Sequence, residues 1–243
     1  MKTLQVDERE DRVVVTLDRP AQRNAINAEM IDELHQICGG LEREPKLLLL
    51  AGTGDHFAGG ADIAELRQRG REDALAGINR TLFDRIGKLP LPTVAAVSGY
   101  ALGGGAELTY ACDIRVATST ALFGNPEPNL GIMAAAGASY RLQKLVGVSV
   151  AKQVLLGVKN LDAEEALRTG LVIEVTEPGG HLLAAHKLLD RISRLSPMAL
   201  RLTKIIVDAP GSHAFADDIA QAVLFESPDK HDRMTAFLEK KKS

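Results

Sequence analysis

Short, continuous runs of apolar residues, separated by helical patterns, are the feature that most restricts the fold of this chain. The runs cover residues 13–17, 46–51, 93–97, 114–117 and 171–175. A strand that is apolar on both sides must be covered on both faces, which is typical of parallel sheets. Between the first two runs, apolar residues recur at the helical period behind Asn27, a residue that can cap a helix. This alternation predicts parallel βα units and an α/β fold.

The pattern changes after about residue 177, where the strand runs end and helical patterns follow one another. We expect helices over residues 181–195, 197–207, 212–225 and 229–242. The chain is thus predicted to consist of a core, residues 1–180, and an all-helical region, residues 181–243. Such a short helical region has too small a core to stand alone, so it should pack on the core or on another subunit.

Composition excludes several classes of protein. A formal net charge of −3 without a long basic run argues against nucleic-acid binding. The longest apolar runs fall short of the roughly 20 residues that a membrane span needs, and the first residues are charged, unlike a signal peptide. Cys38 and Cys112 lie in apolar helical patterns, which favours buried, reduced thiols, and no histidine or cysteine spacing suggests a metal site. We expect a cytoplasmic protein without a metal.

Residues 99–108, with the sequence GYALGGGAEL, carry three adjacent glycines into a helical pattern that contains Glu107. A helix N-terminus with exposed N–H groups stabilises negative charge. Two phosphate-binding motifs fail here, because Leu108 takes the place of the last glycine of a dinucleotide fingerprint and Gly105 that of the lysine of a Walker loop. The run is then either a helix start that a ligand can approach closely, or glycine packing against a neighbouring strand.

A second carboxylate, Glu127, follows Pro126 at the end of an expected strand. Ligand sites gather at the carboxyl ends of parallel strands, although a single glutamate is more often simply solvated. Two nearby carboxylates can hold or move a proton. Two further loops, residues 23–27 (RNAIN) and 54–62 (GDHFAGGAD), either enter helices or present backbone groups to a ligand.

Taken together, these segments resemble the crotonase superfamily, which comprises the enoyl-CoA hydratases and isomerases. The resemblance covers nearly the whole chain, and its segments come in the family order: RNAIN, FAGGADIAEL, PTVAAVSGYALGGGAELTYACDIRVA, FGNPE and AFLEKK. It implies a spiral of ββα units followed by a helical trimerisation region. The protein would then be a homotrimer or a dimer of trimers.

The resemblance also implies a reaction, the reversible syn addition of water to a 2-enoyl-CoA thioester. The backbone N–H groups of Ala61 and Gly104 would bind the thioester oxygen as an oxyanion hole. Glu127 would exchange the proton on the α-carbon, and Glu107 would orient and activate the water. Coenzyme A would enter only as part of the substrate, with no other cofactor.

Coenzyme A would lie over Arg23, Asn24 and Ala25 and over the segment formed by Ala61, Asp62 and Ile63, mostly against backbone atoms. A lysine that the family often carries two residues after the aspartate is replaced by Ala64. Near the carboxyl end, Phe237 and Lys240 match an aromatic residue and a lysine that reach the nucleotide end of coenzyme A.

One segment departs from the family pattern. Residues 130–142 read LGIMAAAGASYRL, with alanines in place of a proline and two glycines, and Tyr140 in place of a glutamine. The loss of proline and glycine favours more regular helix there, and the added methyl groups would narrow a pocket beside Glu127. Two alternatives stay open: a double-bond isomerase that uses Glu127 as its sole base, and a non-catalytic binding protein with this fold.

Overall fold

The computed structural model describes residues 1–157, 159–211 and 214–240, the side chain of Lys240 excepted. Its centre is a six-stranded sheet with the strand order β1-β2-β3-β4-β6-β9. The strands are β1 (Leu4–Glu8), β2 (Arg12–Leu17), β3 (Leu47–Gly52), β4 (Thr93–Val97), β6 (Ile114–Thr118) and β9 (Glu174–Thr176). All neighbouring pairs are parallel except β1 and β2. The predicted parallel α/β arrangement is confirmed.

The expected strand over residues 171–175 begins only at Glu174. Leu171 and Val172 are buried in the core instead, and Arg115 Nε donates a hydrogen bond of 2.6 Å to the Leu171 carbonyl. The Ile173 N–H still donates to the Arg115 carbonyl at 3.0 Å. The apolar run therefore marks buried chain, of which only the last part pairs as a strand.

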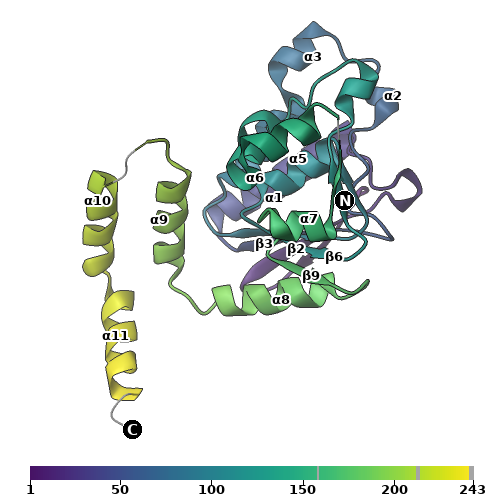
Figure 1. Ribbon diagram of the computed structural model, residues 1–243. Helices are drawn as coiled ribbons and strands as arrows, with labels where there is room; N and C mark the ends of the chain where they lie inside the picture. Colours follow the sequence, from purple (N-terminus) through teal and green to yellow (C-terminus); the bar gives the residue numbers. More distant parts are fainter. Residues whose placement is uncertain (158, 212–213, 241–243) are drawn as a thin grey trace.

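Both faces of the large sheet are covered, as the continuous apolar runs require. Leu48 and Leu50 belong to a core shared with α1 (Ala28–Arg43), α4 (Ile78–Gly87), α5 (Gly104–Ala111) and α6 (Ala138–Leu155). Leu47 and Leu49 point the other way, toward α8 (His181–Ile192). Figure 1 shows α8 below the sheet and α1, α5 and α6 above it. Thus α8, although part of the all-helical region, closes the core.

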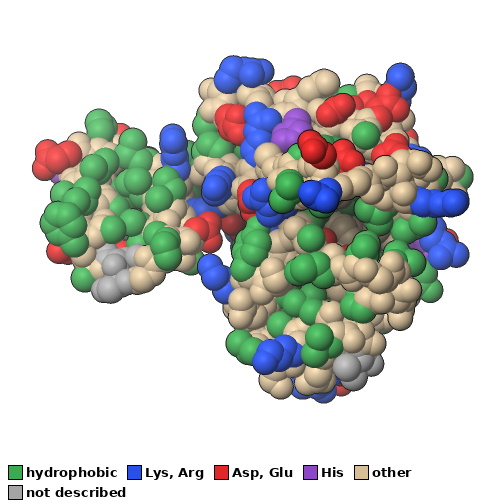
Figure 2. All heavy atoms as spheres, turned by 90° about the horizontal axis from the view of Figure 1, so that it is seen from above, with side chains coloured by type: hydrophobic (Ala, Val, Ile, Leu, Met, Phe, Trp, Pro, Cys, Tyr) green, Lys and Arg blue, Asp and Glu red, His purple; other side chains and the backbone are tan. Residues whose placement is uncertain are grey.

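The last three helices, α9 (Pro197–Asp208), α10 (Ala214–Phe225) and α11 (Pro228–Lys240), extend away from the body as a separate lobe (Figure 1). An ion pair of 2.7 Å between Lys204 and Asp113 ties α9 to the body. The predicted helices are confirmed within the described residues, and residues 212–213, 241 and 242 of those predictions lie outside them. Figure 2 shows hydrophobic side chains gathered on this lobe. Its exposed apolar side chains include Ile205, Val207, Phe215, Ile219, Val223 and Phe225.

A small three-stranded sheet positions the loops of interest. It consists of β5 (Tyr100–Leu102), β7 (Leu122–Gly124) and β8 (Leu161–Asp162), with β5 parallel to β7 and β7 antiparallel to β8. The ends of β5 and β7 are joined by a hydrogen bond of 2.8 Å from the Gly103 N–H to the Gly124 carbonyl. Since α5 follows β5, and Glu127 follows β7, this pairing brings both predicted glutamates to one edge.

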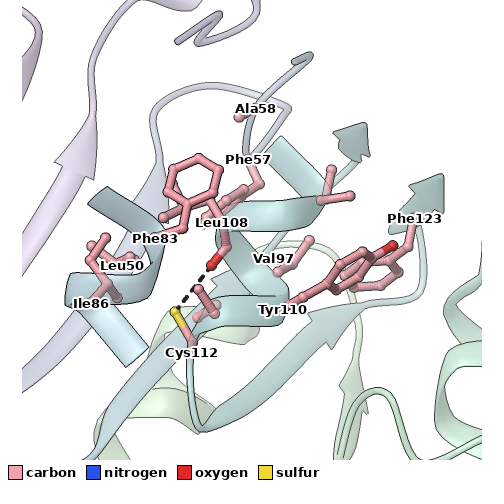
Figure 3. Packing of buried hydrophobic residues seen from close by; sticks show 14 of the residues in the cluster. Leu50, Phe57, Ala58, Phe83, Ile86, Val97, Leu108, Tyr110, Cys112 and Phe123 are labelled. Carbon is pink, nitrogen blue, oxygen red and sulfur yellow. Dashed lines mark hydrogen bonds between the residues drawn. The ribbon is translucent and has the colours of Figure 1, made fainter. Parts of the chain in front are cut away.

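Helix α5 is buried along its whole length of eight residues. Figure 3 shows Leu108 of this helix packed near Phe57, Phe83 and Ile86, with Tyr110 on the side of Val97 and Phe123. At its C-terminal end the buried guanidinium of Arg115 donates to the carbonyls of Thr109 and Cys112, at 3.0 and 2.6 Å. This cation satisfies the carbonyl end of the helix and complements its dipole. The N-terminal end is left to face a cavity.

The remaining short helices are α2 (Ile63–Leu66), α3 (Arg71–Ala76), α7 (Ala163–Arg168) and two 3-10 turns, η1 (Pro20–Gln22) and η2 (Glu127–Leu130). Cys38 and Cys112 are buried free thiols, as expected. Within the described ranges, none of the helices combines the length and apolar character needed to cross a membrane.

Candidate functional site

The loop that ends at Ala61 lies against the first turn of α5. A parallel bridge joins Ala61 to Ile26, whose N–H donates to the Gly60 carbonyl at 2.8 Å. At Gly105, any side chain would place its Cβ 2.4 Å from the Ala58 carbonyl oxygen, so only glycine permits this close approach. The glycine run therefore both packs against a neighbouring segment and opens a helix.

Two backbone N–H groups, those of Ala61 and Gly104, lie side by side at this junction. The position that a Cβ on Gly104 would occupy is only 3.6 Å from the Ala61 nitrogen. Neither N–H donates to any acceptor among the described residues. Both residues line a cavity of about 480 Å³. The cavity thus has two free donors at a helix N-terminus, an arrangement suited to negative charge.

Glu107, in the first turn of α5, lines the same cavity and is almost fully buried. Its Oε1 accepts hydrogen bonds from the N–H groups of Ala136 and Ala138, at 2.7 and 3.0 Å. Burial raises the pKa of Glu107 to about 7, and the charge of Glu127 adds to this, while the two N–H groups act against it. A carboxyl group with a pKa near neutrality can both accept and release a proton.

Residues 132–137 are not helical, so the expectation of more regular helix in residues 130–142 is wrong for this part, whereas residues 138–142 belong to α6. The segment turns because Glu107 takes the N–H groups of Ala136 and Ala138, and α6 begins only at Ala138. Arg141 also stabilises this turn. It donates to the Ala136 carbonyl at 3.1 Å and pairs with Asp84 of α4, which also accepts the Tyr140 hydroxyl.

Glu127 begins the turn η2 directly after Pro126 and also lines the cavity. Its Oε2 has no hydrogen-bond partner in the part of the chain that the structure describes, and Asn125 donates weakly to Oε1 at 3.5 Å. Burial raises the pKa of this carboxyl group. Gly103 beside it has a φ of +51°, which side chains rarely adopt and which explains the glycine there; a Cβ at this position would also stand 3.2 Å from Oε1. Unlike a solvated surface glutamate, Glu127 is a buried group with an unused oxygen.

A second cavity, of about 310 Å³, adjoins the first. Ala61 and Ile63 line both, and Arg23, Ala25 and Asp62 line the second. Asn24 lies outside both; its buried amide donates to the carbonyls of Thr53 and His56, at 2.9 and 2.8 Å. Asn24 therefore holds residues 23–27 against the neighbouring loop.

Phe237 and Lys240 lie on α11, in the lobe that extends away from the body (Figure 1). Phe237 is not among the residues that line the two cavities, and neither is Lys240, whose side chain the structure does not describe. Within one chain, the lobe and the cavities are separate parts of the molecule.

Residues 66–80 supply a wall of the larger cavity that the sequence did not indicate. Leu66, Arg69, Ile78, Asn79 and Arg80 line it. A polar side chain in a helical pattern is usually solvent-exposed, so nothing in the sequence marked Asn79 or Arg69 as part of a site.

Comparisons with known proteins agree on one family. The family model described as enoyl-CoA hydratase/isomerase matches residues 8–243. A short-chain-enoyl-CoA hydratase from Clostridium acetobutylicum is 38% identical, over 97% of this chain and 94% of that protein. A crotonyl-CoA hydratase from Syntrophomonas wolfei is 35% identical, over 98% and 95%. The crystal structure of an enoyl-CoA hydratase from Bacillus anthracis matches with a TM-score of 0.92 and 30% identity, over 98% of this chain and 96% of that chain.

The raised pKa of Glu107 predicts a pH-dependent stability. Between about pH 4.5 and 7 the folded chain keeps a proton on Glu107 that the unfolded chain has lost, so this group's contribution to the free energy of unfolding falls as pH rises. Glu107→Gln removes the effect. We expect the free energy of unfolding of the variant to rise by up to about 3 kcal/mol relative to the wild type between about pH 4.5 and 7. Above pH 7 the difference should not grow further. Urea unfolding at pH 4.5, 6 and 8 measures the difference.

Glu33→Gln is the matched control with the opposite sign. Burial acts to raise the pKa of Glu33, but the Thr3 hydroxyl and the N–H groups of Lys2 and Thr3 hold it below its ordinary value. The stability that this carboxylate contributes is present above about pH 4.5 and is lost as pH falls below it. In the same series extended to pH 3, the Glu33→Gln variant should therefore gain on the wild type as pH falls. A difference between wild type and Glu107→Gln that did not change with pH would contradict the raised pKa.

Proposed function

Because this chain belongs to the enoyl-CoA hydratase/isomerase family, we propose that it adds water reversibly across the double bond of a 2-enoyl-CoA thioester. One observation carries the proposal. Two buried carboxyl groups, Glu107 and Glu127, line the same cavity as the free N–H groups of Ala61 and Gly104. Hydration needs these two elements: donors for a thioester oxygen and groups that move protons. In this proposal no metal or redox cofactor takes part.

The thioester oxygen would accept hydrogen bonds from Ala61 and Gly104. Attack of water at C3 moves electrons toward this oxygen and gives an enolate, whose negative charge the two donors stabilise. One such donor is typically worth about 3 kcal/mol of transition-state stabilisation. The dipole of the buried helix α5 acts in the same direction.

The two glutamates would divide the proton transfers. Glu107, held by the N–H groups of Ala136 and Ala138, orients the water and takes its proton as the oxygen bonds to C3. Glu127, with its unpartnered Oε2, gives a proton to C2 of the enolate. Transfer of a proton from Glu107 to Glu127 then restores the starting state, so the sum is one water added. Each acid–base role contributes about 100- to 10,000-fold in rate.

The second cavity is our candidate for the coenzyme A moiety, since Ala61 and Ile63 line both cavities and the thioester would lie between them. The exposed side chain of Arg23 stands at this cavity and carries a positive charge suited to a phosphate. Phe237 and Lys240 of the same chain are remote from it, so their proposed contact with coenzyme A would come from a neighbouring subunit.

We propose a trimer, or a dimer of trimers, in which the apolar side chains of α9 and α10 are covered by other subunits. Phe215, Ile219 and Val223 of α10 are each at least half exposed in the single chain. Figure 2 shows hydrophobic side chains gathered on the lobe that contains this helix. Exposed apolar patches of this kind mark interaction sites.

Light scattering should give three or six chain masses for the wild type. Ile219→Asp should lower the mass and Asp217→Asn should not, while a monomeric wild type would contradict the proposal.

The function is tested by Glu127→Gln, which keeps the shape of the side chain but removes the proton. We expect hydration of crotonyl-CoA to fall by about 100- to 10,000-fold, with binding of the CoA ester retained. Loss of absorbance of the conjugated thioester measures turnover, and calorimetry with butanoyl-CoA measures binding. Glu164→Gln, on the exposed part of α7, is the control and should retain full activity. Unchanged turnover in Glu127→Gln would refute the assignment.

Glu107→Ala separates hydratase from isomerase. A hydratase that uses Glu107 to activate water loses hydration in this variant, whereas an isomerase that uses Glu127 alone keeps its conversion of 3-enoyl-CoA. If wild type converted 3-enoyl-CoA but did not hydrate crotonyl-CoA, the isomerase alternative would replace our proposal. If the wild type bound CoA esters but converted neither 3-enoyl-CoA nor crotonyl-CoA, the binding-protein alternative would replace our proposal.

A further inference from the structure

One polar side chain of the cavity lining, that of Asn79, lies close to the junction of Ala61 and Gly104. Asn79, in the first turn of α4, lines the cavity together with both of these residues. The position that a Cβ on Gly104 would occupy lies 3.7 Å from Asn79 Nδ2 and 3.6 Å from the Ala61 nitrogen. Three nitrogen donors, two from the backbone and one from a side chain, therefore surround the same small space.

The orientation of the Asn79 amide follows from its neighbour. Arg69 Nη1 lies 2.8 Å from one end of the amide. A guanidinium group has only donors, so the atom that faces it must be the carbonyl oxygen, Oδ1. The Nδ2 end then points away from Arg69, toward Gly104. Among the residues that the structure describes, Nδ2 has no acceptor. The hydrogen bond from Arg69 also polarises the amide, which makes its N–H a stronger donor.

From this geometry we infer that Asn79 Nδ2 donates a third hydrogen bond to the thioester oxygen of the substrate. The inference rests on the proposed function and deepens it by adding a catalytic residue. Arg69 acts through Asn79 as a positioning residue, because it keeps the amide from turning its oxygen toward the developing negative charge. Both residues come from the α2–α4 segment, which lines the cavity together with α5.

The charge distribution favours an oxygen acceptor over other uses of Asn79. The Cβ position of Gly104 lies within 4 Å of both Asn79 Nδ2 and the Ala61 nitrogen. A donor or cation placed there would be repelled, whereas an oxygen that carries partial negative charge is attracted by these donors and by the Gly104 N–H. Within the described residues only Oδ1 of Asn79 is used, so Nδ2 is available to a ligand in the cavity.

Asn79→Ala and Asn79→Asp test the inference on the full-length protein. Removal of one oxyanion donor typically lowers kcat by about 100- to 1,000-fold, and we expect a loss near the lower end, with little change in KM for crotonyl-CoA. Asn79→Asp should lose more than Asn79→Ala, because its carboxylate opposes the enolate charge. The aspartate variant can pair with Arg69, so it also serves if the alanine variant does not fold. Gln68→Ala, an exposed neighbour of Arg69, is the control.

A spectroscopic readout separates a donor from a merely structural side chain. The infrared carbonyl band of butanoyl-CoA, labelled with ¹³C at the thioester carbon, should move to lower frequency on binding to the wild type, and by less on binding to the Asn79 variants. Arg69→Met should reduce kcat by less than Asn79→Ala. The double variant Arg69→Met/Asn79→Ala should be no slower than Asn79→Ala alone, since Arg69 acts only through the amide.

The inference is overturned if Asn79→Ala keeps its kcat within about threefold of the wild type, or if the carbonyl band of the bound thioester is the same in both. In that case a wild type that hydrates crotonyl-CoA would leave the proposed function standing. A wild type that binds butanoyl-CoA with the expected band shift but hydrates nothing would instead refute the proposed function and retain Asn79 as a thioester ligand. Failure to bind any CoA ester would refute both.

Discussion

The close contact between helix α5 and the loop of residues 58–61 is the constraint on which the rest of the site depends. It exists because Gly105 has no side chain, so the loop backbone can lie against the first turn of the helix. The contact is held from both ends. Arg115 satisfies the carbonyl end of α5, and Ile26 fixes the loop through hydrogen bonds on either side of Ala61. The cost of burying a whole helix with one carboxyl group is offset by apolar packing around Leu108 (Figure 3) and by the two N–H groups that bind Glu107.

Much of this arrangement could be predicted from the sequence. Strand β4 occupies residues 93–97 as expected, and Asn27 caps α1 by accepting the Met30 N–H at 3.0 Å. These predictions succeed because buried parallel strands and helix caps depend on short-range patterns. The crotonase-type fold and the enoyl-CoA hydratase/isomerase family, inferred from the order of the loop motifs, are confirmed by the family match and by structural neighbours. The roles of the individual site residues stay predictions.

What could not be predicted depends on contacts between distant segments. Residues 132–137 lack proline and yet do not form helix, because Glu107 and Arg141 bind the turn from outside it. Strand β1 was not expected, since only Leu4 of its residues is buried and the strand pairs on one side alone. Asn79 resembles any polar residue on a surface helix until α4 is packed against α5. For residues 132–137 and for Asn79 a deciding partner lies in a distant segment, Glu107 and Gly104 respectively, whereas β1 pairs with the next strand of the chain.

The central claim is that the space between the Ala61 and Gly104 N–H groups receives the thioester oxygen, and Gly104→Ala tests it most directly. The added methyl group would stand 3.6 Å from the Ala61 nitrogen, an ordinary van der Waals distance, so the fold should persist while the space is filled. Gly40→Ala, on α1 with open space around it, is the control. The account predicts that Gly104→Ala unfolds at the same urea concentration as the control but hydrates crotonyl-CoA at least about 100 times more slowly. A folded Gly104→Ala protein with undiminished turnover would contradict it.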